Sequence, residues 1–333
     1  MFLNAYYLRA HMYTLVPRHV REDMAWMAGV GNRAVTVAVL EQDLFAAVEN
    51  LEIVQREAER AGLQLYVVPS RWGSLVAGAP KVPSIFSARN PEACMQNRDG
   101  SPLIEWLGPI ASVHHPATFE FFCRSLERLS SIVPVSGIIW DEPKALALKD
   151  YSPAARQALA GKDMDDAGVH VDAQAEFFDR VGAEVLRRKA DLRLCMFLHA
   201  NMKGYAVERC AGIRNLHDFG CDGRPFQGED GGGNDSDGSP SGKLLCDYGP
   251  YFVTEARTRG KRPLLLIENH AMSERDMEIM DTRLPEVLNF GAEHLIYYYS
   301  PRSLRDPDRN MAILAGHLRH SPRLREDRRV DRH

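Results

Sequence analysis

The chain predicts an α/β protein, and within that class a (β/α)8 TIM barrel with long loops after strands 3 and 4. Short apolar runs alternate with amphipathic helical stretches almost to the end of the chain. The runs are rich in apolar residues throughout, as in parallel strands that are covered on both faces. The alternation supplies eight strand–helix units, which suit a closed barrel better than an open sheet. The turn from Leu8 to His11 also lacks the glycine pattern of an open dinucleotide-binding sheet.

The strands are expected where apolar residues are continuous. In chain order they cover residues 2–8, 34–40, 64–69, 137–140, 193–199, 216–221, 263–267 and 294–299. The fourth run, Ile138 to Trp140, leads into Asp141 and Glu142, and Pro143 then ends it because proline cannot continue a hydrogen-bonded ladder.

The helices are expected between these strands, where apolar residues recur at helical spacing. In chain order they cover residues 18–28, 45–61, 118–132, 172–190, 203–213, 248–259, 273–288 and 308–319. In the first helix Val20, Met24 and Met27 carry the pattern. The seventh begins at Ser273 with a pattern like a capping box, and Gly62 is a suitable C-cap for the second.

Two connections are much longer than the usual 2–6 or so residues of such units. Residues 71–116 follow the third strand and residues 143–171 follow the fourth, so both insertions are expected to wall a cleft at the carboxyl ends of the strands. A third loop, residues 228–242, is rich in Gly, Asp and Ser and lacks the final glutamate of a calcium loop, so we predict a solvated loop there. We expect residues 1–320 to form one catalytic barrel domain and residues 321–333 a charged tail.

Composition bounds the function. The 333 residues carry 45% hydrophobic and 26% charged side chains and a net charge of -4, which favours a soluble domain and indicates neither a nucleic-acid partner nor a membrane partner. No leader pattern and no apolar run near ~18 residues is visible, so a cytoplasmic location is expected unless a leader is missing. The six cysteines form no C-x-x-C pair, so we expect free thiols, with Cys195 in the core, and neither a metal nor a cofactor.

Polar residues follow the expected strands at their carboxyl ends, which converge on one mouth in a barrel. They are Arg9, His11, Glu41, Asp43, Arg71, Trp72, Asp141, Glu142, His199, Asn201, Asp222, Arg224, Glu268, Asn269, His270, Tyr299, Ser300 and Arg302. Glu142 and Glu268 end the fourth and seventh strands. Two carboxylates facing each other there are able to flank a glycosidic bond, one as proton donor and one attacking or stabilising the anomeric carbon.

On these residues the chain resembles the clan A (β/α)8 retaining glycoside hydrolases. Trp140-Asp141-Glu142-Pro143 is similar to the Asn-Glu-Pro motif after their fourth strand, and Leu266-Ile267-Glu268-Asn269 to their seventh strand end. The resemblance implies Glu142 as acid/base, Glu268 as nucleophile and a small glycoside or oligosaccharide as substrate. Asp141 departs from the family's Asn, which donates a hydrogen bond to the sugar, whereas an ionised Asp only accepts. A second carboxylate beside Glu142 also favours protonation of one of the two, which suits a proton donor.

Other residues of the mouth are interpreted as substrate-binding. Trp72 is a candidate platform for a sugar ring, and Trp140 a weaker one. Tyr299 is nearest the mouth in the run from Tyr297, and we expect it to donate to the nucleophile. His114 or His115, at the end of the first insertion, is a candidate donor, and Arg71 is a candidate partner for an acid group. The remaining substrate-binding candidates are Glu41, Asp141, His199, Asn201, Asn269 and His270.

Two other classes of function stay open from the sequence. Barrel isomerases and epimerases of sugars bind a divalent metal with strand-end carboxylates and histidines, and Glu142, His199, Asp222 and Glu268 are a possible set. A carbohydrate-binding barrel without catalysis is the third alternative. The sequence leaves the identity of the sugar and the oligomeric state undefined.

Overall fold

A computed structural model of the chain describes residues 1–8, 15–78, 80–105, 107–226, 244–299 and 304–321. Eight strands form a closed barrel in which neighbouring strands are parallel. They are β1 (Phe2–Tyr7), β2 (Ala34–Val39), β3 (Gln64–Pro69), β6 (Gly137–Asp141), β7 (Arg193–His199), β8 (Asp218–Gly223), β9 (Arg262–Ile267) and β10 (His294–Tyr299). The predicted (β/α)8 barrel is therefore confirmed.

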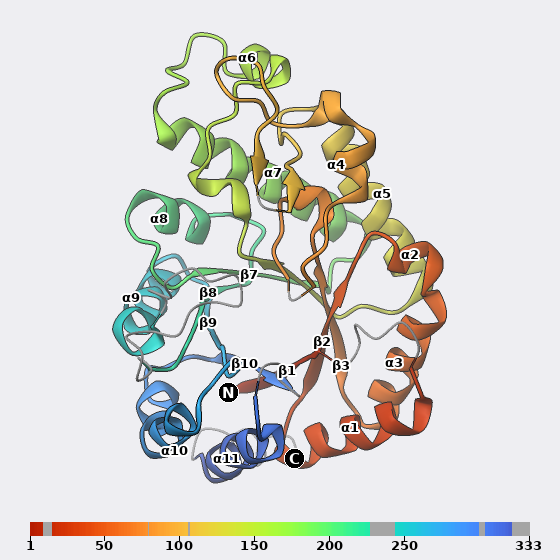
Figure 1. Ribbon diagram of the computed structural model, residues 1–333, viewed down its shortest axis with the longest axis vertical. Coiled ribbons are helices and arrows are strands. Elements are labelled where there is room, and N and C mark those ends of the chain that lie inside the picture. Colours follow the sequence, from red (N-terminus) through yellow and green to blue (C-terminus); the bar gives the residue numbers. More distant parts are fainter. Residues whose placement is uncertain (9–14, 79, 106, 227–243, 300–303, 322–333) are drawn as a thin grey trace.

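Helices surround the ring of strands (Figure 1). They are α1 (Pro17–Val30), α2 (Asp43–Ala46), α3 (Val48–Arg60), α5 (Pro116–Ile132), α7 (Ala167–Arg188), α8 (Tyr205–Ala211), α9 (Leu245–Thr258), α10 (Glu274–Leu288) and α11 (Pro307–His320). The expected helix over 45–61 is interrupted at Ala47, so α2 and α3 are separate. The capping box of α10 is confirmed, because Ser273 and Asp276 bond each other's backbone N–H groups.

Seven of the predicted strands match the structure to within one residue at each end, and the sixth is shifted by two. Leu216 was assigned to that strand because it is apolar, but it lies in the preceding turn, where its N–H donates to Ile213 O. β8 instead contains Gly220, a weak strand former. A Cβ at Gly220 would lie 1.6 Å from Leu264 O, so the close approach of β8 to β9 requires glycine.

Side chains of β6 alternate between the two faces of the barrel wall. Trp140 is fully buried and lies against Phe122 of α5 and Phe178 of α7, so it points outward. The strand period of two therefore directs Ile139 and Asp141 inward. Cys195 is fully buried on β7, as expected, and all six cysteines are free thiols.

The amino ends of the strands are closed by a buried polar cluster around Asp218. Its Oδ1 accepts from Arg193 Nη2 at 2.7 Å and from Arg262 Nε at 3.0 Å, and its Oδ2 accepts from Arg262 Nη2 at 2.5 Å. His294 Nδ1 lies 2.7 Å from the same Oδ2. The cluster joins β7, β8, β9 and β10 at the end of the barrel opposite to the mouth.

The two long insertions lie side by side beyond the ring of strands, at the top of Figure 1. The first contains η2 (Trp72–Ser74), α4 (Ile85–Arg89), η3 (Pro91–Ala93) and the short hairpin β4 (Ile104–Glu105) and β5 (Gly108–Pro109); the second contains η4 (Lys144–Ala147) and α6 (Pro153–Ala158). Ser112 Oγ donates to Asp150 Oδ2 at 2.5 Å, and Tyr151 N donates to Gln96 O at 2.9 Å. These hydrogen bonds join the two insertions into one continuous wall.

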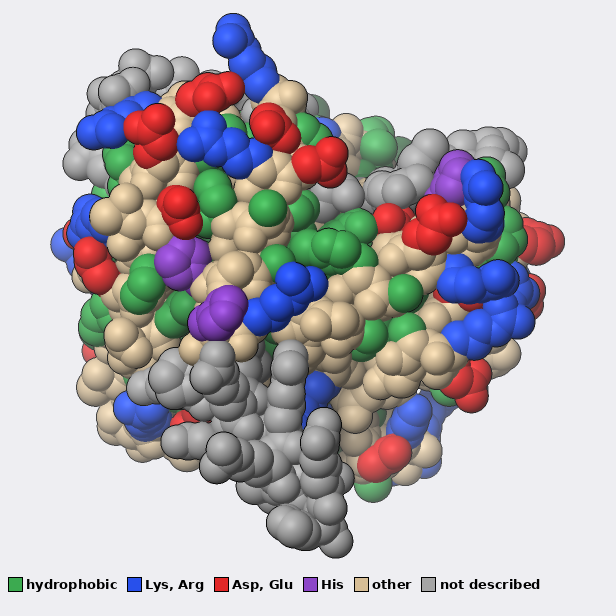
Figure 2. Space-filling view, turned by 90° about the horizontal axis from the view of Figure 1, so that it is seen from below, with side chains coloured by type: hydrophobic (Ala, Val, Ile, Leu, Met, Phe, Trp, Pro, Cys, Tyr) green, Lys and Arg blue, Asp and Glu red, His purple; other side chains and the backbone are tan. Residues whose placement is uncertain are grey.

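Figure 2 views the molecule from the side of α1, α10 and α11, and there basic and acidic side chains are interspersed rather than gathered by sign. Within the described ranges, none of the helices has the length and apolar character needed to cross a membrane. Several predicted features lie outside the described residues: the loop 228–242, the tail beyond Ser321, and Arg9, His11, Ser300 and Arg302.

Candidate active site

Glu142 stands at the end of β6, in a backbone conformation that non-glycine residues rarely adopt. Its φ is 38°, and its N–H donates to Phe197 O on β7 at 3.0 Å, so the strand pairing holds the turn in place. Only 8% of the residue is exposed. Lys144 Nζ donates to Glu142 Oε2, and His199 Nε2 lies 3.8 Å from Oε1. The carboxyl group is thus held between a cationic and a titratable group at the barrel mouth.

Glu268 stands in the corresponding place at the end of β9. Its N–H donates to Gly223 O on β8 at 2.9 Å, and 5% of the residue is exposed. His270 Nε2 lies 3.8 Å from Glu268 Oε1. Each of the two strand-end glutamates therefore has one histidine at the same distance from its carboxyl group.

Tyr298 of β10 lies where several strand ends converge. Its ring packs against that of His270, with centroids 5.3 Å apart and the ring planes tilted by 45°. Burial, followed by the charges of Glu268, Asp141 and Asp222, raises the pKa of Tyr298 well above its ordinary value. The phenol is therefore protonated at neutral pH and lies within electrostatic range of three carboxylates from β6, β8 and β9.

His199 and Asn201 follow β7 on the Glu142 side of the mouth. His199 Nδ1 lies 2.7 Å from Asn201 Oδ1. Because an amide oxygen only accepts, Nδ1 carries the proton in this pair, which leaves Nε2 as the nitrogen facing Glu142. The structure thus brings Glu142, His199 and Asn201 together at one side of the mouth.

The expectation that Trp72 is a sugar platform is wrong. The side chain is fully buried, its Nε1 donates to Val39 O at 2.9 Å, and its ring packs on Phe121 and Phe122 of α5. Arg71 adopts a left-handed conformation with φ 62° just before it. This turn directs the indole toward the helix layer and away from the mouth.

Tyr299 and Asn269 are also misassigned. Tyr299 Oη donates to Asp23 Oδ1 of α1 at 2.8 Å, so its hydroxyl faces the helix layer and not the nucleophile. Asn269 is fully buried; its Nδ2 donates to Tyr298 O at 3.0 Å and to Asn310 Oδ1 at 2.8 Å, and its Oδ1 accepts from Tyr298 N at 2.8 Å. Asn269 fixes β10 and α11 instead of binding substrate.

Glu41 fixes the first insertion instead of facing the mouth, which corrects its assignment to substrate binding. Its Oε1 accepts from Gly73 N at 3.1 Å and Ser84 Oγ at 2.6 Å, and its Oε2 accepts from Phe86 N at 2.7 Å. Burial raises the pKa of Glu41, and the hydrogen bonds from Ser84 and Phe86 partly oppose the rise.

The two adjacent histidines take structural positions in the first insertion. His115 caps α5, and its Nδ1 accepts from Ala117 N at 3.3 Å. Burial lowers the pKa of His114, and the charges that affect it most after burial are those of Asp150 and His170. His114 therefore interacts with charged groups of the second insertion, and His115 forms its hydrogen bond with the first turn of α5.

Two residues of the mouth, Lys144 and Tyr298, were not among the sequence candidates. Lys144 follows Glu142 by only two residues, and this spacing matches no motif in the sequence. Its hydrogen bond to the Glu142 carboxylate depends on the 3-10 turn η4, which begins at Lys144. For Tyr298, strand alternation offered the signal, because it places Tyr298 on the opposite face of β10 from Tyr297 and Tyr299.

The described residues do not assemble the metal set that a sugar isomerase would need. The group of three potential ligands whose atoms lie within 4.8 Å of one another is Cys195, Asp218 and His294, at the other end of the barrel. There Arg193 and Arg262 already donate to both oxygens of Asp218, so a cation does not fit.

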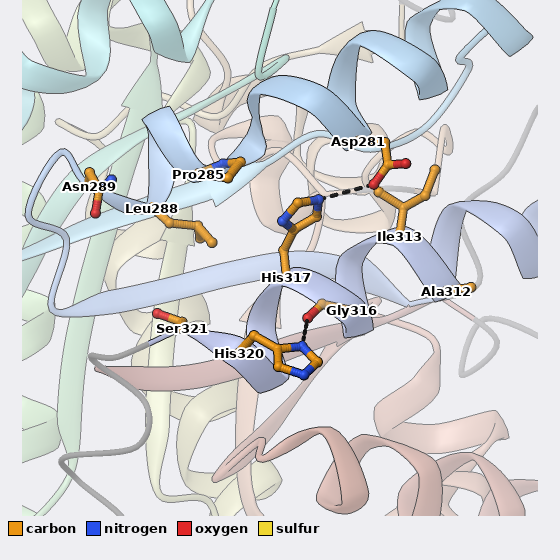
Figure 3. Close-up of a pocket in the computed structure, with 10 residues that line it drawn as sticks. All are labelled: Asp281, Pro285, Leu288, Asn289, Ala312, Ile313, Gly316, His317, His320 and Ser321. Carbon is orange, nitrogen blue, oxygen red and sulfur yellow. Dashed lines mark hydrogen bonds and ion pairs between the residues drawn. The ribbon is translucent and has the colours of Figure 1, made fainter.

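A groove of about 580 Å³ lies between α10 and α11 (Figure 3). His317 Nε2 lies 3.1 Å from Asp281 Oδ1 across it, and His320 Nδ1 donates to Gly316 O at 2.7 Å. The groove reaches Leu288, the last residue of α10, and His320, the last of α11. Helix carboxyl ends lie at the amino ends of the strands in such barrels, so this groove is remote from the chemistry of the mouth.

Solved structures similar to this chain are glycoside hydrolases. A β-galactosidase from the Antarctic haloarchaeon Halorubrum lacusprofundi gives a TM-score of 0.63 at 14% identity over 96% of this chain and 57% of that chain. An α-L-fucosidase from Paenibacillus thiaminolyticus gives 0.62 at 14% identity over 95% and 49%. A β-galactosidase from Marinomonas ef1 gives 0.60 at 12% identity over 97% and 62%. No protein family and no curated protein matches the chain.

These identities establish the fold alone. The resemblance to (β/α)8 glycoside hydrolases is therefore confirmed for the architecture of the barrel. This chain also spans less than two thirds of each of those three proteins. Activity has to be argued from the residues of the mouth.

Proposed function

We propose that the protein is a retaining glycoside hydrolase acting on a small glycoside or oligosaccharide, with residues 1–320 as one catalytic domain. The observation that carries the proposal is the placement of Glu142 and Glu268. Both are buried carboxylates at the carboxyl ends of barrel strands, and each has a histidine nitrogen 3.8 Å away. Similarity of the barrel to those of glycoside hydrolases supports the same reading.

The two carboxylates have different roles in this mechanism. Glu268 attacks the anomeric carbon, while Glu142 gives its proton to the leaving oxygen; Glu142 then takes a proton from the water that releases the sugar from Glu268. Tyr298 is protonated and close to Glu268, so it is positioned to donate to that carboxylate and to orient it. His270 packs against the ring of Tyr298 and helps to hold the phenol in place.

Hydrolysis of a panel of aryl glycosides, with and without EDTA, tests the activity. We expect hydrolysis that EDTA does not change. Glu142→Gln lowers kcat/KM by about 10²–10⁴-fold on phenyl glycosides, as expected for loss of a general acid. The loss is smaller on dinitrophenyl glycosides, because that leaving group needs no proton. Glu268→Gln abolishes turnover on both.

The matched control is Glu52→Gln, which changes an exposed glutamate of α3 far from the mouth and leaves the rates unchanged. Equal turnover of all three variants and the parent protein would refute the paired-carboxylate mechanism. NMR of the first-formed anomer tests retention: retention implies carboxyl groups about 5–5.5 Å apart, and inversion a wider gap.

A further inference from the structure

Arg224 is a buried cation at the carboxyl end of β8, and one of its guanidinium donors has no acceptor. The residue is 2% exposed. Its Nη2 donates to Ala271 O at 3.2 Å, but its Nε has no hydrogen-bond partner, and the side chain forms no ion pair with any residue that the structure describes. A buried donor without an acceptor costs free energy, and a ligand oxygen beside Nε would offset that cost.

The strand directs Arg224 into the mouth. Phe219 of β8 packs against Phe252 of α9 with ring centroids 6.0 Å apart, so the side chain of Phe219 faces the helices. Arg224 extends the strand by one residue, because it pairs with Leu244 in a β-bridge. The strand period of two therefore places Arg224 on the opposite face from Phe219 and on the same face as Asp222, inside the barrel wall.

His270 is a second buried residue of the mouth with an unsatisfied atom. It is 5% exposed, and its Nδ1 has no hydrogen-bond partner within the described ranges. Its Nε2 lies 3.8 Å from Glu268 Oε1, and the negative charge of that carboxylate favours the tautomer with the proton on Nε2. In this tautomer Nδ1 is an acceptor. The mouth therefore contains an unsatisfied acceptor as well as an unsatisfied donor.

Both groups flank the proposed nucleophile. Glu268 N donates to O of Gly223, the residue before Arg224, at 2.9 Å. His270 follows Glu268 by two residues, and the next residue, Ala271, is the one that accepts from the guanidinium. The sugar that becomes attached to Glu268 in the proposed mechanism is therefore the part of the substrate nearest to the donor and the acceptor.

The two groups match hydroxyls better than an anion. A hydroxyl both accepts and donates, so sugar hydroxyls are able to supply partners for the guanidinium and for the imidazole. An ionised carboxylate only accepts, which leaves the imidazole nitrogen unsatisfied. The phenol of Tyr298, which packs against the ring of His270, also feels the charges of three carboxylates, and these charges repel an anionic ligand. The three are Asp141, Asp222 and Glu268.

We propose that Arg224 and His270 bind hydroxyl groups of the sugar that occupies the Glu268 side of the mouth, with Arg224 Nε as donor and His270 Nδ1 as acceptor. This inference rests on the proposed function and specifies its substrate class: glycosides whose sugar at this position is neutral and carries free hydroxyls. The bond from Arg224 is charge-assisted, so it gives the larger share of the discrimination against a sugar that lacks the hydroxyl.

Calorimetry with the Glu268→Gln protein tests the inference without turnover. The panel contains glucose, galactose, mannose, fucose and xylose, together with glucuronate, galacturonate and the monodeoxy derivatives of the neutral sugar that binds most tightly. We expect at least one neutral sugar to bind and one of its monodeoxy derivatives to bind about tenfold or more weakly. The two uronates are expected to bind no more tightly than glucose and galactose.

Substitutions of Arg224 in the Glu268→Gln protein connect the lost affinity to the guanidinium. Arg224→Met is expected to weaken binding of the parent sugar about tenfold or more. It leaves binding of the critical monodeoxy derivative unchanged, because in that complex the hydrogen bond is already absent. Arg224→Lys keeps the charge but has no Nε–H, and we expect the same pattern from it.

His270→Phe, in the same protein, tests the acceptor. It keeps an aromatic ring against Tyr298 and removes Nδ1, and we expect binding of the parent sugar to weaken by about two- to tenfold, as for a neutral hydrogen bond. Arg259→Met removes an exposed arginine at the end of α9. It is the matched control for Arg224→Met and is expected to leave every affinity unchanged.

Stability separates sugar binding from a structural role of Arg224. Because Arg224→Met removes a buried donor that lacks an acceptor, we expect an unfolding temperature close to that of the Glu268→Gln protein. A large fall in unfolding temperature, together with unchanged sugar affinity in Arg224→Lys, would show that the guanidinium serves the fold and would overturn the inference.

Three binding results would also overturn it: monodeoxy sugars that bind as tightly as their parent, uronates that bind more tightly than the neutral sugars, or no binding by any sugar of the panel. These outcomes are separable from failure of the proposed function. Hydrolysis that is insensitive to Arg224→Met and to removal of each hydroxyl rejects the hydroxyl site alone. Hydroxyl-dependent binding by a protein that hydrolyses no glycoside rejects the glycosidase mechanism alone.

Discussion

Glu142 has to hold a proton when the leaving oxygen needs one, yet Lys144 Nζ donates to its Oε2. An ammonium group at this position favours the ionised carboxylate over the acid. The lysine side chain is 39% exposed, so water weakens the effect without removing it. The ion pair therefore limits how much of the enzyme is in the protonated, active form at high pH.

Lys144→Met is expected to move the basic limb of the kcat/KM profile to higher pH. Removal of the positive charge makes Glu142 easier to protonate, so the acid form persists to higher pH. The profile is measured on a neutral aryl glycoside, so that the substrate carries no charge that could interact with Lys144. Lys162→Met is the control and keeps the parent profile; a basic limb that moves to lower pH in Lys144→Met would contradict the assignment of Glu142 as acid.

The two tyrosines at the end of β10 separate catalysis from packing. Tyr299→Phe removes the bond to Asp23, which also accepts from Tyr7 Oη at 2.6 Å, and we expect a loss of about 1 kcal/mol of stability and an unchanged kcat. Tyr298→Phe removes the phenol near Glu268, and we expect kcat to fall about tenfold or more with little change in stability. Urea unfolding measures the stability of both variants, and steady-state kinetics measures their kcat. A fall in kcat confined to Tyr299→Phe would contradict the assignment of Tyr298 to catalysis and Tyr299 to packing.

At the scale of elements, the strands were predictable because each is a continuous apolar run. The face of the barrel wall to which each side chain points was predictable only in part. Alternation separates Tyr298 from Tyr299, but which of them faces the barrel depends on a register of one residue, which the pairing of β10 with β1 and β9 sets.

The insertions were recognisable by length, but their side chains were not assignable. The burial of Trp72 follows from the left-handed turn at Arg71, and the bonds of Glu41 follow from the path of residues 73–86. Both depend on contacts between segments far apart in the sequence, which residue patterns do not encode. The positions after a barrel strand were therefore found reliably, and the direction each side chain takes from there was not.

Asp150 is expected to hold the two insertions together. Its carboxylate accepts from Ser112 Oγ, Ser152 N and Gln96 N at 2.5, 2.8 and 3.3 Å, so Asp150→Ala leaves two buried donors and one half-buried donor without this acceptor. We expect faster proteolysis within residues 71–171 and a raised KM, while the barrel unfolds at a nearly unchanged temperature. Limited proteolysis with mass spectrometry checks this. Asp191→Ala, in an exposed turn, is the control, and equal cleavage of both variants would contradict the role of Asp150.

At the scale of the whole molecule, the barrel separates its chemistry from its stability. The mouth collects the groups that we propose to contact substrate. The opposite end is closed by Asp218 and His294, which are fully buried, and by two arginines that donate to Asp218 and are partly exposed. Burial alone would raise the pKa of Asp218, but hydrogen bonds and charge from His294 and Arg262 outweigh it and hold the pKa well below its ordinary value. Burial lowers the pKa of His294, so the ring is neutral at pH 7, with Nδ1–H donating to Asp218.

Both shifts make the fold sensitive to acid, in two separate ranges. The unfolded chain protonates His294 below a pH of about 6.5 and the buried ring resists this, so stability falls as the pH drops below that value. Asp218 takes up its proton in the unfolded chain below about pH 3.9, while the folded state keeps it ionised, so its contribution is present above that pH and is lost below it.

His294→Gln is therefore expected to flatten the dependence of unfolding free energy on pH between about 7 and 5, because the titrating ring is gone while an amide donor to Asp218 remains. Asp218→Asn is expected to cost about 3–5 kcal/mol at pH 7, because it leaves Arg193 and Arg262 near a neutral group in a buried site. Urea unfolding at a series of pH values measures both. If the slope between pH 7 and 5 is the same in His294→Gln as in the parent protein, the acid sensitivity does not arise from this end of the barrel.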